Sequence, residues 1–549
     1  MSIFNLSFDP RDPLFDLPGL SGVRWGIQIF TTDNYYALNP DKVQVEASEH
    51  AVHVTCSGLS WGGQQQRSDG RVEVDLRTDD GAFVWTVQAW HQDPIKSIKL
   101  MFWGLPQSAL AKGWWQATSD KDDVFHPTHD APLLWRYPWR EWLSAWACAG
   151  DAAQAICVSV RDSQVRAKRL YVFQPPYAPG EVVELVCEED ATRWGGHFVT
   201  PSIRLRLCSS AAEIDADFSA HQAFIEAAFK LQPWETRSDV PGWLHKTRLV
   251  LNLHGQHWTG YVFNTFDRMA ETLRFITEYI PGDQLLVYIP GWEGRYYYAY
   301  PNYQPGEAMG GGPAFKRLMQ TARELGAKMM PMFGMHGANT QRYADWRQAV
   351  FTSRTSGYAR FVNFPDWDSD RFGEDDQVFL NPGETGFRRH LVQQIGAIVD
   401  DYQVDGVFLD TSACWFNDPR YNLVAGYQLL TDELHRSYPD LLIAGEGWYD
   451  AMLRYFPVNQ SWLGVERNYR YPQLLTRYGR ALGHLADGTP GHGSTGVHEG
   501  GFHPAPPQRP TVGHIPSLGI ADDTLSKYRE AVIQICRTAA ANNTGSNAG

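Results

Sequence analysis

From about residue 240 onward, short apolar runs alternate with segments in which apolar residues recur every three or four positions. This alternation constrains the fold most, because such runs are typical of buried parallel strands and the recurring spacing is typical of covering helices. The clearest runs are RLVLNLHG, QLLVYIPGW, AKMMPMFGMHG, VDGVFLDTS and LLIAGEGW, with weaker candidates in SWLGVE, GHLADGTPGHGSTGVHEGG and TVGHIPSLGI. About eight such units predict an α/β fold, a (β/α)8 TIM barrel over residues 240–538.

The first 209 residues follow a different pattern. Alternating or β-branched runs, such as GRVEVDLRTDDGAFVWTVQAW and SIRLRLC, are separated by Gly, Asp and Pro. This pattern predicts an antiparallel β-sandwich that precedes the barrel. Residues 210–239 form a predicted linker, a helix followed by a loop, and the small polar residues 539–549 predict a disordered tail.

The charge balance and the cysteines exclude several classes of protein. The formal net charge is −14, which argues against binding to nucleic acid or to an anionic membrane surface. The sequence contains no run of about 18 apolar residues that would predict a membrane span. It also shows no secretory signal, in which a basic segment is followed by an apolar one, so we expect a cytoplasmic protein. The seven cysteines are scattered without a C-x-x-C pair, which indicates neither a disulfide framework nor a cysteine zinc site.

Two carboxylates end consecutive predicted strands. Asp410 ends DGVFLD and Glu446 ends LLIAGE, and in such barrels the active site forms at the carboxyl ends of the strands. A carboxylate there gains nothing from packing and is costly to desolvate without partners. Because neighbouring strands lie about 4.8 Å apart, the two carboxyl groups can approach to about 5–5.5 Å, the separation used by retaining glycosidases. Inverting enzymes need about 6.5–9.5 Å.

The two side chains suit different roles in a double displacement. Asp410 is short and follows its strand directly, which suits attack on the anomeric carbon as nucleophile. Glu446 is longer and lies between Gly445 and Gly447, so it can reach a leaving-group oxygen as acid/base. Repulsion between close carboxylates raises the pKa of one of them, as a general acid requires.

These phrases carry a resemblance to a known superfamily. The barrel half resembles the retaining α-glycosidases that include the α-amylase clan, the dextranases and the endo-α-N-acetylgalactosaminidases, through D-G-V-F-L-D at 405–410 and A-G-E-G at 444–447. The chain has Phe408 where the α-amylase pattern has Arg, and it lacks the Lys-bearing nucleophile motifs of α-galactosidase and α-glucosidase relatives. The resemblance implies an α-linked substrate and leaves the sugar open.

Aromatic and polar residues near the predicted strand ends suit sugar binding. The chain has 21 Trp, 25 Tyr and 27 Phe, and aromatic faces complement the C–H patches of sugars. Trp292 is the best stacking candidate, and the phrase GVHEGGFH places a His and a Glu at a late strand end. The expected substrate-binding residues are Trp292, Glu293, Arg295, His336, Trp415, Trp448, His498, Glu499 and His254.

Two alternatives belong to other classes. A metal-dependent barrel hydrolase would use His254 and His257, although an i, i+3 spacing on a strand points them to opposite faces. A non-catalytic carbohydrate-binding protein would have no need to bring two carboxylates together. We therefore expect an enzyme that acts on an oligosaccharide or glycoside, without a metal or other cofactor. The sequence leaves its oligomeric state open.

Overall fold

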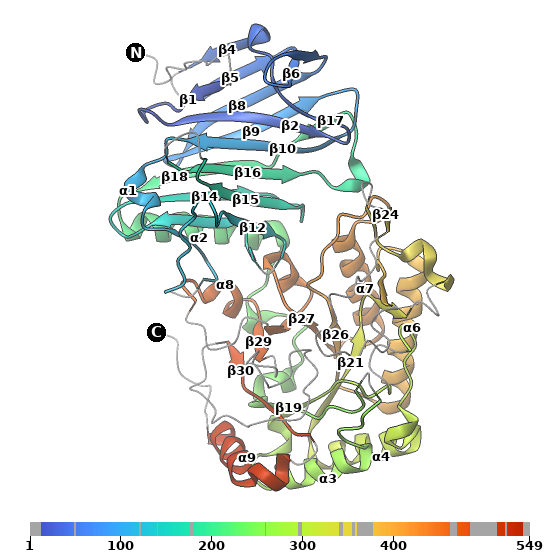
Figure 1. Ribbon diagram of the computed structural model, residues 1–549. Coiled ribbons are helices and arrows are strands. Elements are labelled where there is room, and N and C mark those ends of the chain that lie inside the picture. Colours follow the sequence, from blue (N-terminus) through green and yellow to red (C-terminus); the bar gives the residue numbers. More distant parts are fainter. Residues whose placement is uncertain are drawn as a thin grey trace.

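The computed structural model describes residues 13–48, 51–119, 122–139, 141–175, 180–257, 260–294, 299–339, 344–353, 357–358, 377–461, 469–483, 513–521 and 524–541. Figure 1 shows a β-sandwich at one end of the molecule and an α/β barrel at the other. Both parts were predicted from the sequence.

The sandwich consists of two antiparallel sheets. The first has the order β12-β15-β16-β10-β2-β3-β6-β7, with β1 beside β2, and the second has the order β11-β13-β14-β18-β9-β8-β5-β4, with β17 beside β9. The strands of the first sheet are β1 (Leu14–Asp16), β2 (Arg24–Thr31), β3 (Tyr35–Leu38), β6 (Leu59–Trp61), β7 (Gln66–Ser68), β10 (Ile95–Trp103), β12 (Leu133–Tyr137), β15 (Lys168–Phe173) and β16 (Val182–Glu188). Those of the second are β4 (Val43–Ala47), β5 (Ala51–Cys56), β8 (Arg71–Asp79), β9 (Ala82–Trp90), β11 (Trp114–Gln116), β13 (Trp146–Gly150), β14 (Ala155–Arg161), β17 (His197–Val199) and β18 (Ser202–Cys208).

Alternating side chains hold the two sheets together. In β8 every second residue is buried over most of the strand, as expected when one face of a sheet meets a core. Trp85 of β9 packs between the sheets, with ring centroids 6.2 Å from Trp25 and 5.1 Å from Phe102. The short helix α1 (Gln107–Leu110) lies between the strands β10 and β11 in the sequence.

The barrel strands are all parallel to their neighbours. They are β19 (Leu249–Asn252), β20 (Leu285–Ile289), β21 (Lys328–Gly334), β26 (Gly406–Asp410), β27 (Leu442–Glu446), β28 (Val458–Ser461), β29 (Arg480–Gly483), β30 (His514–Ile515) and β31 (Ser517–Gly519). Their order is β30-β29-β28-β27-β26-β21-β20-β19-β31. Only Pro516 separates β30 from β31, so the two ends of this order are adjacent in the chain and the sheet closes on itself.

The prediction of eight barrel strands needs one correction. The described residues form nine strands, because the segment predicted as TVGHIPSLGI is interrupted at Pro516, whose ring removes a backbone donor. The sixth and seventh strands also begin earlier than SWLGVE and GHLADG. The sixth, VNQS, carries polar residues, so the apolar pattern did not reveal it. Residues 462–468 and 484–512 lie outside the described part of the chain.

Helices cover the outside of the barrel. They are α3 (Phe266–Thr277), α4 (Gly311–Leu325), α6 (Thr385–Tyr402), α7 (Leu423–Ser437), α8 (Gln473–Thr476) and α9 (Thr524–Ala541). Their inner apolar faces are buried, including Met269 and Leu273 of α3, and Gly326 ends α4 with a φ of 84°. Two small antiparallel pairs accompany them, β22 (Gly337–Asn339) with β25 (Gln377–Phe379) and β23 (Thr352–Ser353) with β24 (Gly357–Tyr358).

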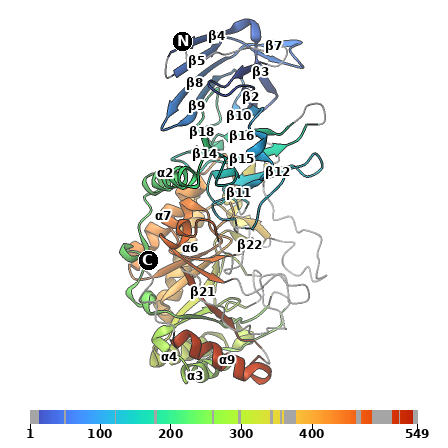
Figure 2. The same ribbon diagram turned by 90° about the vertical axis from the view of Figure 1, so that its left-hand side faces the viewer.

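The linker helix α2 (Ala211–Phe229) lies at the junction of the two parts, as both views show (Figure 1, Figure 2). The connection after β27 contains only the 3-10 helix η8 (Asp450–Arg454), and the one after β28 contains α8, of four residues, in its described part. Helix α2 packs on η8 and on strands β14 and β18, so it covers this side of the barrel in place of a long helix.

Among the described residues, no helix combines the length and the apolar character needed to cross a bilayer.

Removing the ring of Phe218 tests this junction. Phe218 of α2 is fully buried and stacks on Tyr471 of the barrel with centroids 3.8 Å apart. We expect Phe218→Ala to lower the free energy of unfolding by about 3–5 kcal/mol, the usual effect of deleting a buried phenyl ring. Ser219→Ala, at an exposed position of the same helix, is the control and leaves the thermal unfolding midpoint nearly unchanged. Equal midpoints for the two variants would contradict the packing described here.

Candidate active site

Asp410 and Glu446 both face the interior of the barrel. Phe408 and Ala444 belong to the apolar cluster inside the barrel, whereas Leu409 packs outward with the helices. Side chains alternate along a strand, so residues 410 and 446 point the same way as residues 408 and 444, which they follow by two positions. Asp410 is 3% exposed, and Glu446 is partly buried.

The two carboxylates end neighbouring strands. Strands β26 and β27 pair in parallel with Leu409 opposite Gly445, so residues 410 and 446 follow directly on the two paired strands. The backbone N–H of Thr411 donates a hydrogen bond of 2.8 Å to Glu446 Oε2. Thr411 has a φ of 59°, a left-handed conformation that is uncommon for a β-branched residue and typical of functional turns.

Further hydrogen bonds hold the end of β27 against the turn after β26. The N–H of Glu446 donates to Ser412 Oγ at 2.7 Å, and the N–H of Ala413 donates to the carbonyl of Glu446 at 3.0 Å. The backbone of Glu446 is therefore attached on both sides to the residues that follow Asp410.

A third carboxyl group shares this end of the barrel. Burial, together with the negative charges of Asp410, Glu446 and Glu293, holds the pKa of Tyr288 well above its usual value. Tyr288 lies inside the barrel on β20, and its hydroxyl contacts Met332 Sδ at 3.0 Å. The three carboxyl groups thus all lie near one buried tyrosine.

Glu293 differs from the other two acids in its environment. It follows β20, is 9% exposed, and neither carboxyl oxygen makes a hydrogen bond of ordinary geometry within the described residues. Burial raises its pKa to about 8, although its own backbone N–H and the nearby Tyr300 hydroxyl lower it in part. Glu293 is therefore mostly protonated at neutral pH and can donate a hydrogen bond.

Two more buried polar groups lie at strand ends. The indole Nε1 of Trp448, which follows Glu446 by two residues, has no hydrogen-bond partner within the described residues. The same holds for both side-chain atoms of Asn252, the last residue of β19. Unpaired buried polar groups are costly and rare, and a polar ligand that binds here would satisfy them.

Two of the predicted binding residues belong to the core. Trp292 is fully buried, its ring stacks on Phe315, and its Nε1 donates to the carbonyl of Met332 at 2.7 Å, so it offers no exposed face to a sugar. His336 is also fully buried, with Nδ1 2.9 Å from the carbonyl of Leu380 and Nε2 2.9 Å from the Tyr427 hydroxyl. Burial lowers the pKa of His336 to about 4. These positions give no support to the predicted binding roles of Trp292 and His336, which stay predictions.

The other predicted residues have mixed outcomes. Trp415 lies partly buried in the loop after Asp410 and stays a candidate. His254 is buried edge-on against Phe263, with centroids 5.1 Å apart, and burial lowers its pKa to about 3. Arg295, His498 and Glu499 lie outside the described residues.

The alternative of a metal site gains no support from the described part of the chain. There, no group of three or more His, Cys, Asp or Glu side chains is arranged to hold a metal ion.

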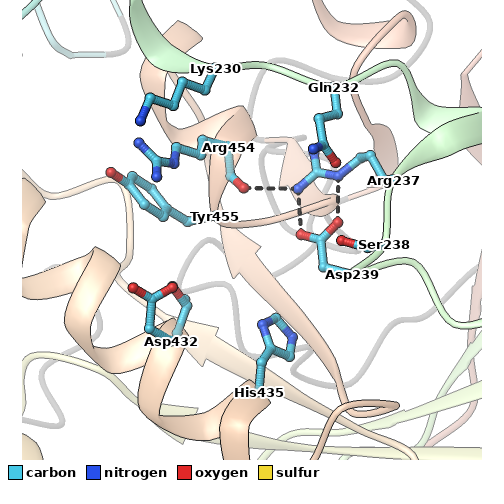
Figure 3. A pocket seen from close by; sticks show the side chains of 10 residues that line it. Lys230, Gln232, Arg237, Ser238, Asp239, Asp432, His435, Arg454 and Tyr455 are labelled. Atoms are coloured by element: carbon cyan, nitrogen blue, oxygen red, sulfur yellow. Dashed lines mark hydrogen bonds and ion pairs between the residues drawn. The ribbon is translucent and has the colours of Figure 1, made fainter.

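A separate polar cavity of about 260 Å³ lies away from these carboxylates (Figure 3). Its lining comes from the end of α2 and the linker, from α7, and from Arg454 and Tyr455 at the end of η8. On one side Arg237 makes an ion pair of 2.6 Å with Asp239. Neither Asp410, Glu446 nor Glu293 contributes to this cavity.

Sequence reasoning missed several residues of the site. Asn252 is a polar residue within the apolar run RLVLNLHG, a signal that was visible in the sequence. Tyr288, within QLLVYIPGW, and Gly334, within AKMMPMFGMHG, gave no such signal, because a tyrosine and a glycine are ordinary residues in buried strands. Gly334 pairs with Asp410 across β21 and β26 and lies against the ring of Tyr300.

Comparisons with known proteins agree on the fold. Neither the protein-family models nor the curated proteins gave a match. Among solved structures, the α-N-acetylgalactosaminidase of Bifidobacterium bifidum in complex with GalNAc aligns with a TM-score of 0.63 and 14% identity, over 84% of this chain and 78% of the other. Its complex with Gal-NHAc-DNJ aligns with a TM-score of 0.61 and 14% identity, over 83% and 76%. The chain therefore shares the fold of this glycosidase across most of its length, and the wider clan stays a prediction.

Replacing Glu293 by Gln tests its protonation. The folded-state pKa of about 8 lies above the reference value of 4.5, so the folded protein holds this proton more tightly than the unfolded chain does. The resulting loss of stability is absent below pH 4.5, grows as pH rises, and levels off above pH 8. Glu293→Gln removes it, so the stability of the variant relative to the wild type rises across this range by a few kcal/mol, about 1.4 kcal/mol per unit of pKa shift. Thermal unfolding of both proteins at several pH values measures this, and a difference independent of pH would contradict it.

Gly334→Ala tests the close packing beside Asp410. A Cβ atom at this position would lie 2.1 Å from the ring of Tyr300, which is fully buried, so the ring must move. We expect a loss of about 1–3 kcal/mol in stability, typical of overpacking. Gly242→Ala is the matched control, because its Cβ would meet nothing within 4 Å. Similar thermal midpoints for the two variants would show that Tyr300 does not lie where described.

Proposed function

We propose that this protein is a retaining glycoside hydrolase that cleaves an α-linked glycoside or oligosaccharide, with Asp410 as nucleophile and Glu446 as acid/base. The observation that carries the proposal is the placement of both carboxylates on neighbouring parallel strands, facing the barrel interior at its carboxyl end. Side chains from adjacent strands, about 4.8 Å apart, favour the short separation of a retaining enzyme over the longer one that admits a water.

The chemistry follows from these positions. In the first step an Asp410 oxygen attacks the anomeric carbon, the bond to the leaving-group oxygen breaks, and Glu446 gives its proton to that oxygen. In the second step Glu446 takes a proton from water, whose oxygen displaces Asp410 from the anomeric carbon and releases the sugar. The hydrogen bond from Thr411 N–H to Glu446 Oε2 orients the carboxyl group for both transfers.

The anomeric preference and the sugar are further parts of the proposal. The D-G-V-F-L-D and A-G-E-G phrases resemble those of α-glycosidases, and the protein with the aligned fold is an α-N-acetylgalactosaminidase with GalNAc bound. Aryl α-glycosides of N-acetylgalactosamine and galactose are therefore the first substrates to test. The polar atoms of Asn252, Glu293 and Trp448 have no hydrogen-bond partner in the part of the chain that the structure describes, and they suit a ligand rich in hydroxyl groups.

One observation favours a second assignment of the acid. A general acid needs a raised pKa, and burial gives Glu293 a pKa of about 8. Glu293 follows β20, two strands away from Asp410 in the order β20-β21-β26. We assign the acid role to Glu446, because its strand is adjacent to that of the nucleophile, and we assign Glu293 to substrate binding.

Two variants and the stereochemistry of the product test the roles. Asp410→Asn is expected to abolish turnover and to retain sugar binding, because the amide cannot form the ester intermediate. Glu446→Ala is expected to lose about 10²–10⁴-fold in rate on substrates with poor leaving groups, with much less loss on activated aryl glycosides, and azide restores turnover because it needs no general base. Proton NMR of the first-formed anomer is expected to show retention.

Three results would contradict these assignments. Net inversion would remove the nucleophile role from Asp410. Azide rescue of Glu293→Ala, with none for Glu446→Ala, would move the acid/base role to Glu293. Unchanged behaviour of Asp410→Asn would favour a non-catalytic carbohydrate-binding protein.

A further inference from the structure

A buried aspartate joins the sandwich to the loop that carries Glu446. Asp450 begins η8, four residues after Glu446, and is 1% exposed. Its carboxylate accepts hydrogen bonds of 2.7 Å from the Tyr137 hydroxyl, 2.7 Å from Ser144 Oγ and 2.7 Å from the N–H of Ala451. Tyr137 ends β12 and Ser144 precedes β13, so two of these three donors come from the sandwich.

The backbone adds a second attachment at the same place. The N–H of Asp450 donates to the carbonyl of Leu143 at 2.9 Å, and the ring of Tyr449 lies edge-on to that of Tyr137 with centroids 6.1 Å apart. The loop after β27 is thus attached to the sandwich through both the backbone and the side chain of Asp450.

The protons of this network have one consistent arrangement. Ser144 has a single hydroxyl proton, and its Oγ lies 2.7 Å from Asp450 Oδ2 and 2.8 Å from Nε2 of His221 on α2. Burial lowers the pKa of His221 to about 3, so this ring is neutral. When Ser144 donates to the charged Asp450, His221 must donate from Nε2 to Ser144. The network then spans α2, the sandwich and the barrel.

The other end of the loop is attached to the barrel. The carboxylate and the backbone of Glu446 bond to residues 411–413, and the N–H of Gly447 donates to the carbonyl of Gln460 at 2.7 Å. Only five residues, 446–450, therefore connect an attachment to the barrel with an attachment to the sandwich. A shift of the Asp450 end is passed to Glu446, because so short a segment has little slack.

We propose that Asp450 is a positioning residue through which the sandwich sets the orientation of Glu446 and of the adjacent Trp448. The inference rests on the proposed role of Glu446 as acid/base. Asp450 itself touches no reacting atom. Its loss would leave the hydroxyls of Tyr137 and Ser144 buried without their acceptor and would release the loop from the sandwich.

The ionisation of Asp450 gives this link a dependence on pH. Burial raises the pKa of Asp450 to about 6, while the hydrogen bonds from Ser144, Tyr137 and Ala451 and the charge of Lys168 lower it in part. The other titratable or charged groups around the network are Tyr137, Tyr449, Asp162, which pairs with Lys168 at 3.0 Å, His221 and, beside His221, Arg161. Below about pH 6 the protonated carboxyl must itself donate, so it loses one accepted hydrogen bond.

Dependence on the leaving group separates positioning of the acid from a general loss of structure. Two aryl α-glycosides of the same sugar, one with a strongly acidic phenol and one with a weakly acidic phenol, are compared by kcat/KM. Asp450→Asn and Tyr137→Phe are expected to lose at least about tenfold more on the poor leaving group, since only that substrate needs proton donation. The acid limb of the kcat/KM–pH profile near pH 6 is expected to disappear in Asp450→Asn.

Tyr471→Phe is the matched control. It removes a hydroxyl that bonds to Asp215 of α2 at 2.9 Å, at the same junction but away from the β27 loop, and keeps the stacked ring. Tyr471→Phe is expected to change kcat/KM by the same factor on both substrates. Equal losses on both substrates in Asp450→Asn and Tyr137→Phe, or no loss at all, would overturn the inference.

Glu446→Ala, measured in parallel, keeps the two claims apart. The positioning role alone fails if the loss in kcat/KM of Glu446→Ala is larger on the poor leaving group and azide restores its turnover, while the Asp450 and Tyr137 variants show neither effect. If Glu446→Ala shows neither behaviour, the proposed acid/base role fails and the positioning role fails with it.

Discussion

The parallel pairing of β26 with β27 is the constraint on which the rest of the site depends. Because Leu409 lies opposite Gly445 and side chains alternate, the next residue on each strand must face the barrel interior, beside the other. A shift of one residue in either strand would turn its carboxylate into the apolar layer beneath the helices. The hydrogen bond from Thr411 to Glu446 then fixes the relation between the two strand ends.

The sandwich contributes to the barrel rather than merely preceding it. After β27 and β28 the described chain has no long covering helix, and α2 packs there with the sandwich behind it. Buried polar groups at this junction, Asp450 with Tyr137 and Ser144, must stay paired, since an unpaired buried carboxylate would be strongly destabilising. The fold therefore couples docking of the sandwich to the geometry of the loop after Glu446.

Periodicity predicted much of this structure and none of the contacts between distant loops. The runs ending at Asp410 and Glu446 were apolar up to one acidic residue, so their strands and their location at the carboxyl ends were visible in the sequence. The core positions of Trp292 and His336 were not visible, because burial depends on Phe315, Leu380 and Tyr427, which come from elsewhere in the chain. The polar strand β28 likewise gives no apolar pattern to detect, whereas the break in the last predicted strand falls at Pro516, a residue visible in the sequence.

The proposed mechanism depends on a covalent bond between Asp410 and the sugar. Incubation with an activated fluorosugar that forms a slowly hydrolysed ester, followed by proteolysis and mass spectrometry, identifies the labelled side chain. We expect one sugar per chain, on the peptide that contains Asp410, and no label in Asp410→Asn. A label on Glu446 or Glu293, or turnover of the reagent without any labelled peptide, would contradict it.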